Sequence, residues 1–198
     1  LGDACASKQK AIERKKFWYD GGQVVDQEIR RNFLDEIKKA CNGTSLHRAQ
    51  TPNGALALVI LLDQFTRNIF RNTSDAYCGD KFALEIVTAS IHQKHDFELS
   101  PVAVIWFYHP FHHSENLAEQ DQGLMLLSRL KERADPQWHE YIERSIEGWT
   151  RHRQIIARFG RFPHRNHILR RKSTLDEKQF LSKDGQSFGQ GPRLVKDN

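Results

Sequence analysis

The chain reads DPQWHEYIERSIEGWTRHRQIIARFGRFPHRN over residues 135–166. The Asp-Pro pair at its start is a helix cap followed by proline at the first helical position. Apolar side chains then recur at spacings that keep one side of a helix facing a core, namely Trp138, Ile142, Trp149, Ile156 and Phe159. Gly160 is typical of a helix end. The segment therefore predicts a long amphipathic helix that ends at residue 160.

Directly after this helix, residues 158–166 gather three arginines, a histidine and an asparagine around two aromatic rings. Residues 151–172 contain eight Arg or Lys and no Asp or Glu, although the whole chain has a formal net charge of only +5. The positive charge is thus local. Polar groups held at a stiff corner, here between Gly160 and Pro163, are typical of a ligand site, and a positive patch attracts phosphates or carboxylates.

The rest of the chain predicts helix after helix, because no segment shows convincing strand-type alternation. Start and stop signals predict an early helix ending near residue 19 and others at about 26–41, 52–70, 74–92, 101–110, 114–134 and 174–181. We therefore predict an all-α fold, an antiparallel array of about eight helices in one domain over residues 1–182. Residues 183–198, rich in Gly, Gln, Ser and Lys, are predicted to form a flexible C-terminal tail.

The helix predicted at residues 52–70 changes abruptly from an apolar run to the polar sequence that begins Asp63-Gln64. A helix that is apolar on all sides is buried, so both side chains are expected to enter an interior or the wall of a cleft. Asp63 can pair with Arg67, four residues on, as Gln64 can with Asn68. Two interpretations stay open: an internal ion pair that fixes helix packing, or an Arg67 ligand clamp oriented by Asp63.

Two further polar residues, Gln120 and His152, interrupt the apolar stripes of later helices. A buried amide without partners costs roughly 1–3 kcal/mol, so Gln120 must be hydrogen-bonded. His152 is either a hydrogen-bonded core histidine or a ligand-binding residue. We predict that the helices at 52–70, 114–134 and 136–159 pack together and that Asp63, Gln120 and His152 share a polar pocket.

The sequence Pro110-Phe111-His112-His113-Ser114-Glu115 lies between two predicted helices. The start of the second helix could hold an anion, while His113 and Glu115 could supply acid and base groups. A metal bound by His112, His113 and Glu115, with His164 or His167, is the alternative. Their spacing matches no strong zinc signature, so we predict neither a metal nor a cofactor.

The cysteines and the apolar runs of the sequence indicate the cellular compartment of the protein. Cys5, Cys41 and Cys78 are odd in number, widely spaced and form no CxxC, which argues against a disulfide framework and a cysteine zinc site. The longest apolar run, residues 55–62, is far shorter than the roughly 20 residues that span a bilayer, and the N-terminus has no apolar signal region. We therefore expect a cytoplasmic protein without a membrane partner.

Several segments of the chain carry a resemblance to a known family: Phe17-Trp18, LLDQFTRNIFR at 61–71, Pro110-Phe111 with His113-Ser114-Glu115, Gln120, His152 with residues 155–166, Leu169 and Ser173-Thr174. In these segments the chain resembles a family of uncharacterised, mainly bacterial proteins, called domain of unknown function 924. The resemblance covers about residues 15–182, and its most specific part is Gly-Arg-Phe-Pro-His-Arg-Asn. It implies a fold similar to tetratricopeptide-like helical arrays, although the chain shows no repeat of about 34 residues. It implies no reaction.

The chain departs from the family at two glycine positions. Asn72 follows Arg71 where the family has glycine, and asparagine tolerates a left-handed conformation. Arg170 replaces the second glycine. If that position requires a positive φ, the loop is strained or rebuilt, and a role for Arg171 is in doubt.

We predict a helical binding module whose groove takes an anionic small molecule or an acidic peptide end. Its predicted ligand-binding residues are polar side chains of the interrupted helices and the corner: Asp63, Gln64, Arg67, Gln120, His152, Arg161, Arg165 and Asn166. The alternative is an enzyme, a hydrolase or another acid/base catalyst, with His113, Glu115 and His164 as catalytic residues and arginines stabilising negative charge. Nucleic acid is a less favoured partner because no nucleic-acid motif accompanies the charge. The oligomeric state stays open.

Overall fold

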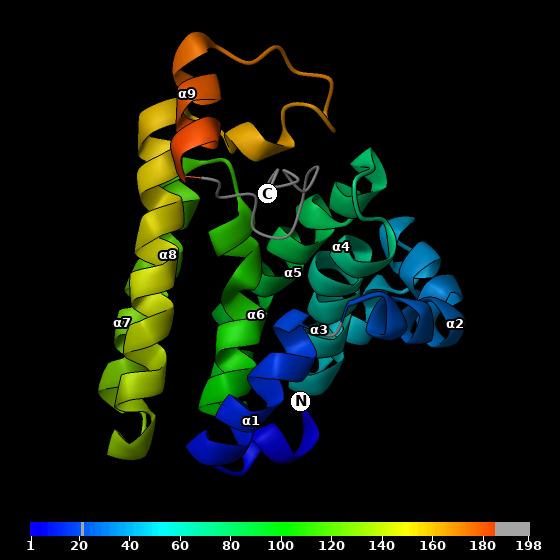
Figure 1. The fold of residues 1–198 in the computed structure, drawn as a ribbon. Helices are drawn as coiled ribbons and strands as arrows, with labels where there is room; N and C mark the ends of the chain where they lie inside the picture. Colours follow the sequence, from blue (N-terminus) through cyan, green and yellow to red (C-terminus); the bar gives the residue numbers. More distant parts are fainter. Residues whose placement is uncertain (21, 185–198) are drawn as a thin grey trace.

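A computed structural model describes residues 1–20 and 22–184 (Figure 1). The described residues contain no strand, and their α-helices are α1 (Lys8–Asp20), α2 (Gly22–Cys41), α3 (Pro52–Val59), α4 (Thr66–Ile69), α5 (Asp80–His92), α6 (Pro101–His113), α7 (Leu117–Arg133), α8 (His139–Phe159) and α9 (Leu175–Asp184). A π-helical turn, Ile60–Phe65, joins α3 to α4 into one continuous helix. The described residues therefore form eight separate helices. The predicted all-α single domain is thus confirmed.

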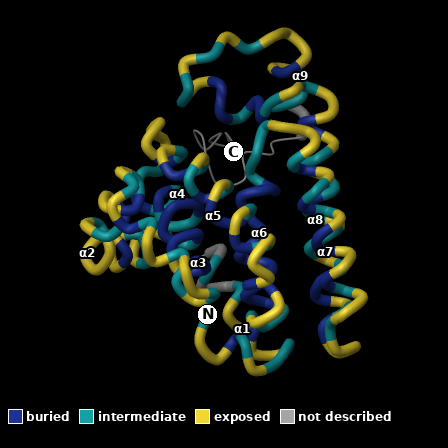
Figure 2. The backbone as a smooth tube through the Cα atoms, turned by 180° about the vertical axis from the view of Figure 1, so that it is seen from behind, coloured by how far each residue is buried: buried dark blue, intermediate teal, exposed yellow. Residues whose placement is uncertain are grey.

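Helix α6 is the centre of the packing. Figure 1 shows it between the α7–α8 pair on one side and α2 to α5 on the other, with α1 near one end and α9 near the other. Every residue from Val102 to His112 is buried, and in Figure 2 most of this helix is drawn as buried. The predicted packing of the 52–70, 114–134 and 136–159 helices needs correction, because the first of these contacts α6 rather than forming a major interface with α7 or α8. A helix with apolar side chains on every face needs partners all round, and α6, whose residues 102–107 are all apolar, takes the central place for this reason.

Helix α6 also runs further than the sequence predicts. Proline usually ends a helix because it lacks an N–H and its ring crowds the carbonyl four residues earlier. Here Pro110 lies inside α6, which continues to His113. The ring of His109 lies 2.8 Å from the Ile105 carbonyl and also interacts with the backbone of Trp106, whose carbonyl Pro110 cannot bond. The extra turn brings His112 and His113 onto the helix.

The helix predicted at 52–70 contains the π-helical turn. In such a turn the backbone bonds reach one residue further than in an α-helix, which loosens local carbonyls, and these turns often occur at functional sites. The Thr66 hydroxyl donates to the Leu62 carbonyl at 2.7 Å, and the Arg67 guanidinium donates to the Asp63 carbonyl at 2.6 Å. Side chains thus satisfy the backbone that the wide turn leaves open.

The two positions at which the resemblance implies a glycine adopt positive φ angles. Asn72 has φ 63° and Arg170 has φ 54°. The left-handed conformation costs an arginine roughly 1 kcal/mol, which neighbouring contacts must offset. The next backbone N–H, of Arg171, donates to the Asn166 carbonyl at 2.7 Å and holds this loop in shape.

The ends of the chain complete the fold. Helix α9 extends to Asp184, beyond the predicted end near residue 181, and packs Phe180 against Phe159 of α8 with ring centroids 5.1 Å apart. The tail predicted at 183–198 falls, from residue 185 on, outside the described residues. None of the helices in the described ranges has the length and apolar character needed to cross a bilayer.

Two helical glycines give opposite predictions for stability. A Cβ on Gly123 of α7 would lie 2.8 Å from Phe111 Cβ and 3.1 Å from the Trp149 ring, so Gly123→Ala should destabilise the protein by about 1–3 kcal/mol. A Cβ on Gly148 of α8 meets nothing closer than 3.8 Å, so Gly148→Ala should be neutral or stabilising by up to roughly 1 kcal/mol. Chemical denaturation measures both, and equal effects would contradict the close packing of α6, α7 and α8.

Candidate functional site

Asp63 lies on the π-helical turn with its carboxylate fully buried. His113 Nδ1, on the last turn of α6, lies 2.8 Å from Asp63 Oδ1 and 2.9 Å from Oδ2. Arg67 Nη1 lies 3.4 Å from Oδ1, and the Gln64 amide also donates to this carboxylate. Burial alone would raise the pKa of Asp63, but His113 and Arg67 outweigh it and hold the pKa below its usual range. Asp63 is therefore an ionised carboxylate that orders three polar side chains.

Arg67 links Asp63 to a second carboxylate. Its side chain is 11% exposed, and its two terminal nitrogens each lie 3.0 Å from an oxygen of Asp80, at the start of α5. The guanidinium carbon lies 5.5 Å from the centre of the Tyr77 ring. The predicted Asp63–Arg67 pair thus forms as part of a larger buried cluster. Such a cluster fixes helix packing and, at the same time, holds Arg67 in one orientation.

The predicted contact between Gln64 and Asn68 is replaced by two others. Gln64 donates to Asp63, whereas Asn68 donates to Asp26 of α2 at 2.7 Å, where Arg71 Nε also donates at 2.7 Å. A carboxylate is a stronger hydrogen-bond acceptor than an amide, which explains the exchange. These contacts tie α4, and Arg71 just after it, to α2.

Four histidines and one tryptophan pack where α6 meets α8. The ring centres of His112 and His152 are 3.9 Å apart, and those of His112 and His113 are 5.0 Å apart. Trp149 stacks on His112 at 4.8 Å and meets His109 edge-on at 5.4 Å. Burial lowers the pKa of all four histidines, so their rings are neutral at pH 7. Nδ1 of His112 is buried without a hydrogen-bond partner among the described residues.

A cleft of about 620 Å³ opens between α1, the π-helical turn, α6 and α8. His112, His113 and His152 line it, together with Trp149. Five cationic side chains also line it: Lys15, Arg67, Arg71, Arg144 and Arg151. No aspartate or glutamate is among the described residues of its lining. Arg67, Arg71 and Arg144 are paired with carboxylates that are not part of this lining, whereas Lys15 and Arg151 form no ion pair with another described residue. The cleft therefore presents a positive surface.

Arg165, in the corner after α8, is 6% exposed and lies between two rings. Its guanidinium carbon is 4.8 Å from the Tyr77 ring centre and 4.4 Å from that of Phe162. Nε has no hydrogen-bond partner among the described residues. Burial and the neighbouring charge of Arg67 lower the pKa of Arg165, and the charge of Arg165 in turn contributes to the lowered pKa of His152. A buried guanidinium with an unused donor is thus placed close to the cleft.

Gln120 is hydrogen-bonded to the backbone. It is 1% exposed, and its amide nitrogen donates to the carbonyls of His112 at 2.6 Å and Ser114 at 2.8 Å, at the end of α6. The structure therefore brings Asp63, Gln120 and His152 together around the last turn of α6. Both N–H donors of Gln120 are used there, so this residue positions the turn rather than facing the cleft.

Glu115 and Arg161 are engaged in ion pairs away from the cleft. Glu115 accepts from Arg171 at 2.5 and 3.0 Å and from the Phe162 backbone N–H at 2.8 Å. These bonds outweigh burial and lower the pKa of Glu115. Arg161 donates to Glu177 of α9 at 2.6 and 2.9 Å. Arg171, whose role the sequence leaves in doubt, thus fastens the corner to the start of α7.

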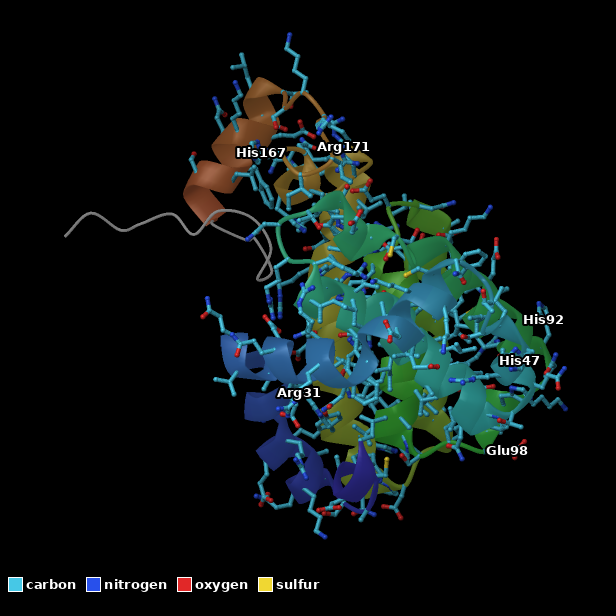
Figure 3. All side chains as sticks on the ribbon, turned by 90° about the vertical axis from the view of Figure 1, so that its right-hand side faces the viewer. Arg31, His47, His92, Glu98, His167 and Arg171 are labelled. Atoms are coloured by element: carbon cyan, nitrogen blue, oxygen red, sulfur yellow. The ribbon has the colours of Figure 1, made fainter. Side chains whose placement is uncertain are left out.

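The remaining predicted residues lie in the corner itself. His164 is half-buried with its ring centre 5.5 Å from that of Phe162, and burial, with the charge of Arg165, lowers its pKa to about 2. Asn166 is buried and donates to Ser173 Oγ at 3.1 Å. His167 is exposed at the α9 end of the molecule, near Arg171 and far from His47 and His92 (Figure 3). Across the described chain, no three His, Cys, Asp or Glu side chains converge in a way that could hold a metal ion.

Sequence reasoning names His112 and His113 but misses His109. These three histidines follow an i, i+3, i+4 spacing, which places them on one face of a helix, so the signal for His109 is present in the sequence. Tyr77 and Asp80 give no such signal, because they reach Arg67 through the packing of α5 and the turn before it.

Comparison with known proteins gives the family but not a function. Residues 6–185 match the family described as "Bacterial protein of unknown function (DUF924)", and the chain therefore belongs to this family. A solved structure of a protein of unknown function from Agrobacterium tumefaciens, ATU0120, is similar, with 33% sequence identity and a TM-score of 0.75. The match covers 84% of this chain and 88% of that one. No curated protein matches the chain.

The buried histidines predict a dependence of stability on pH. Their folded pKa values lie below the usual value of about 6.5, so their contribution to stability is complete above that pH. It is lost as the pH falls, because the unfolded chain takes up protons first. Burial lowers the pKa of His152 to about 4. We expect the free energy of unfolding to fall by roughly 1 kcal/mol per buried histidine between pH 7.5 and pH 5.5.

Urea denaturation at both pH values measures this loss. His152→Gln should flatten the dependence, whereas replacing the exposed His92 with Gln should leave it unchanged. Identical pH profiles for the two variants would contradict the neutral state of the half-buried His152.

Proposed function

We propose that this protein binds an anionic small molecule or the acidic end of a peptide in the cleft between α1, the π-helical turn, α6 and α8. The observation that carries the proposal is the charge of the lining, which has five cationic side chains and no carboxylate among its described residues. The volume of about 620 Å³ is that of a typical small-molecule site. The tetratricopeptide-like arrangement implied by the resemblance belongs to this proposal, since such arrays present extended concave binding surfaces.

Two cations of the lining support an anion most directly. Arg151 is exposed on α8, and neither it nor Lys15 forms an ion pair with another described residue. Burial and the charge of Arg144 lower the pKa of Lys15, whose ammonium lies 4.6 Å from the Tyr141 ring centre. A bound phosphate or carboxylate would relieve the repulsion between these like charges.

Arg67 gives the cleft its fixed donor group. Because Asp63 and Asp80 already hold its guanidinium, little further entropy is lost when a ligand contacts it. Asp80 already takes the two-point contact of Arg67, so the fork that can match the oxygens of a carboxylate or phosphate in the cleft is that of Arg151.

Phosphate or succinate should raise the melting temperature in proportion to the logarithm of its concentration above the dissociation constant, by an amount equivalent to about 2.7 kcal/mol at a hundredfold excess over that constant. Arg151→Ala and Arg165→Ala should reduce this rise, since both remove positive charge at or beside the cleft. Differential scanning fluorimetry measures the shift.

The matched control is Arg153→Ala, which removes the same charge from the same helix at a residue paired with Asp121 outside the cleft. Equal responses in Arg151→Ala and Arg153→Ala would reduce the effect to general screening. An Arg165→Ala protein that no longer folds would show that the corner acts as a structural lock, and Arg151 would then carry the test alone.

Hydrolysis is a second candidate function, favoured by the contact between Asp63 and His113. The Asp63 carboxylate accepts the Nδ1–H of neutral His113, which leaves Nε2 as the proton acceptor on a ring that lines the cleft. Nε2 could take a proton from water that attacks an ester or amide carbonyl while Arg67 stabilises the developing oxyanion. Glu115 is held by Arg171, so this candidate rests on His113 and Asp63, with His164 further away beside Phe162.

The anionic ester 4-nitrophenyl hydrogen succinate tests this candidate. His113→Gln should lower the rate of hydrolysis by about 10²-fold or more, and Asp63→Asn should also lower it, because each removes one part of the base. His47→Gln, at an exposed histidine outside the cleft, serves as the control. Equal rates in folded wild type and His113→Gln would exclude His113 as the base for this ester.

A further inference from the structure

Two cysteines that are distant in sequence meet next to the candidate site. Cys41 is the last residue of α2, and Cys78 follows the short helical turn Ser74–Tyr77. Their sulfur atoms lie 2.8 Å apart although 37 positions separate them. Cys41 is half-buried, whereas Cys78 is exposed and within reach of solutes. The third cysteine, Cys5, belongs to the N-terminal turn Gly2–Cys5 and packs against the main core.

Cys78 lies in the segment Tyr77–Asp80, whose two end residues contact Arg67. Tyr77 contacts the guanidinium groups of Arg67 and Arg165, and Asp80 pairs with Arg67. Between them, Gly79 packs so tightly on the π-helical turn that a Cβ there would lie 2.4 Å from the Leu62 carbonyl. A covalent bond at residue 78 would therefore restrain the backbone on which these contacts depend.

We propose that Cys41 and Cys78 form a reversible disulfide that fixes the segment Tyr77–Asp80 to α2 and so restrains the wall behind the anion-binding cleft. The regulatory part of this inference rests on the proposed function, whereas formation of the bond does not. The sulfur contact, the exposure of Cys78 and the position of the segment carry the inference.

The chemistry requires a disulfide co-reactant such as oxidised glutathione. The thiolate of Cys78 attacks one glutathione sulfur, forms a mixed disulfide and releases one glutathione thiolate, which takes up a proton. The Cys41 thiolate then attacks the Cys78 sulfur and expels the second glutathione, so that the protein loses two hydrogen atoms and the glutathione pair gains them. The thiol contact with Cys41 lowers the pKa of Cys78 and raises that of Cys41, which suits Cys78 to the first attack.

The test equilibrates the full chain with oxidised or reduced glutathione, blocks free thiols with N-ethylmaleimide and measures the intact mass. Oxidised wild type should carry one maleimide, on Cys5, and the reduced chain should carry three. Cys5→Ser should still form the bond, whereas Cys41→Ser and Cys78→Ser should stop at a mixed glutathione disulfide or remain reduced. Three free thiols after oxidation, or a bond to Cys5, would overturn the proposal.

The structural consequence has its own measurement. Oxidation of the Cys5→Ser chain should slow hydrogen exchange in peptides covering residues 77–80 and raise the melting temperature by roughly 5 °C. Cys5→Ser/Cys78→Ser, treated in the same way, is the control. Unchanged exchange in an oxidised chain whose mass proves the bond would overturn the restraint. If phosphate and succinate leave the melting temperature of the reduced chain unchanged, that result counts against the proposed function. It does not count against the disulfide, because the intact mass after maleimide labelling and the hydrogen exchange of residues 77–80 do not depend on an anion.

Discussion

The buried carboxylate of Asp63 is the constraint on which the site depends. An unpaired charge in this position would be untenable, and removing one partner of a buried pair typically costs about 3–5 kcal/mol. The π-helical turn sets the carboxylate against the end of α6, where His113 and Arg67 reach it. Arg67 in turn requires Asp80, and Asp80 brings the start of α5 to the same place. One ionised group thus orders three elements around the cleft.

The cleft keeps a positive surface because nearby glutamates form ion pairs elsewhere. Glu115 and Glu177 pair with Arg171 and Arg161 and fasten the corner after α8 to its neighbours. This arrangement leaves Arg165 buried between two rings with an unused donor, and it leaves the mouth of the cleft to arginines, a lysine and neutral histidines. An anion would supply the charge that the described lining lacks.

Local patterns in the sequence predict much of the fold. Helix α8 and its end at Gly160 follow from caps and periodicity. The breaks in the apolar stripes single out Asp63, Gln120 and His152, each of which contacts the last turn of α6, although only His152 of the three lines the cleft. The π-helical turn and the continuation of α6 past Pro110 are decided by tertiary contacts that override local preference. Likewise, Glu115 meets Arg171 and Cys41 meets Cys78 only because distant helices pack together. No periodicity encodes such pairings.

The contact between Asp63 and His113 can be observed directly by nitrogen NMR of the histidine side chains at pH 7, with succinate added stepwise. The account predicts a neutral His113 protonated at Nδ1, with an Nε2 resonance that shifts on titration, while the resonances of the distant His47 and His92 stay unchanged. A His113 protonated at Nε2, or histidine signals that all ignore succinate or all shift alike, would contradict it.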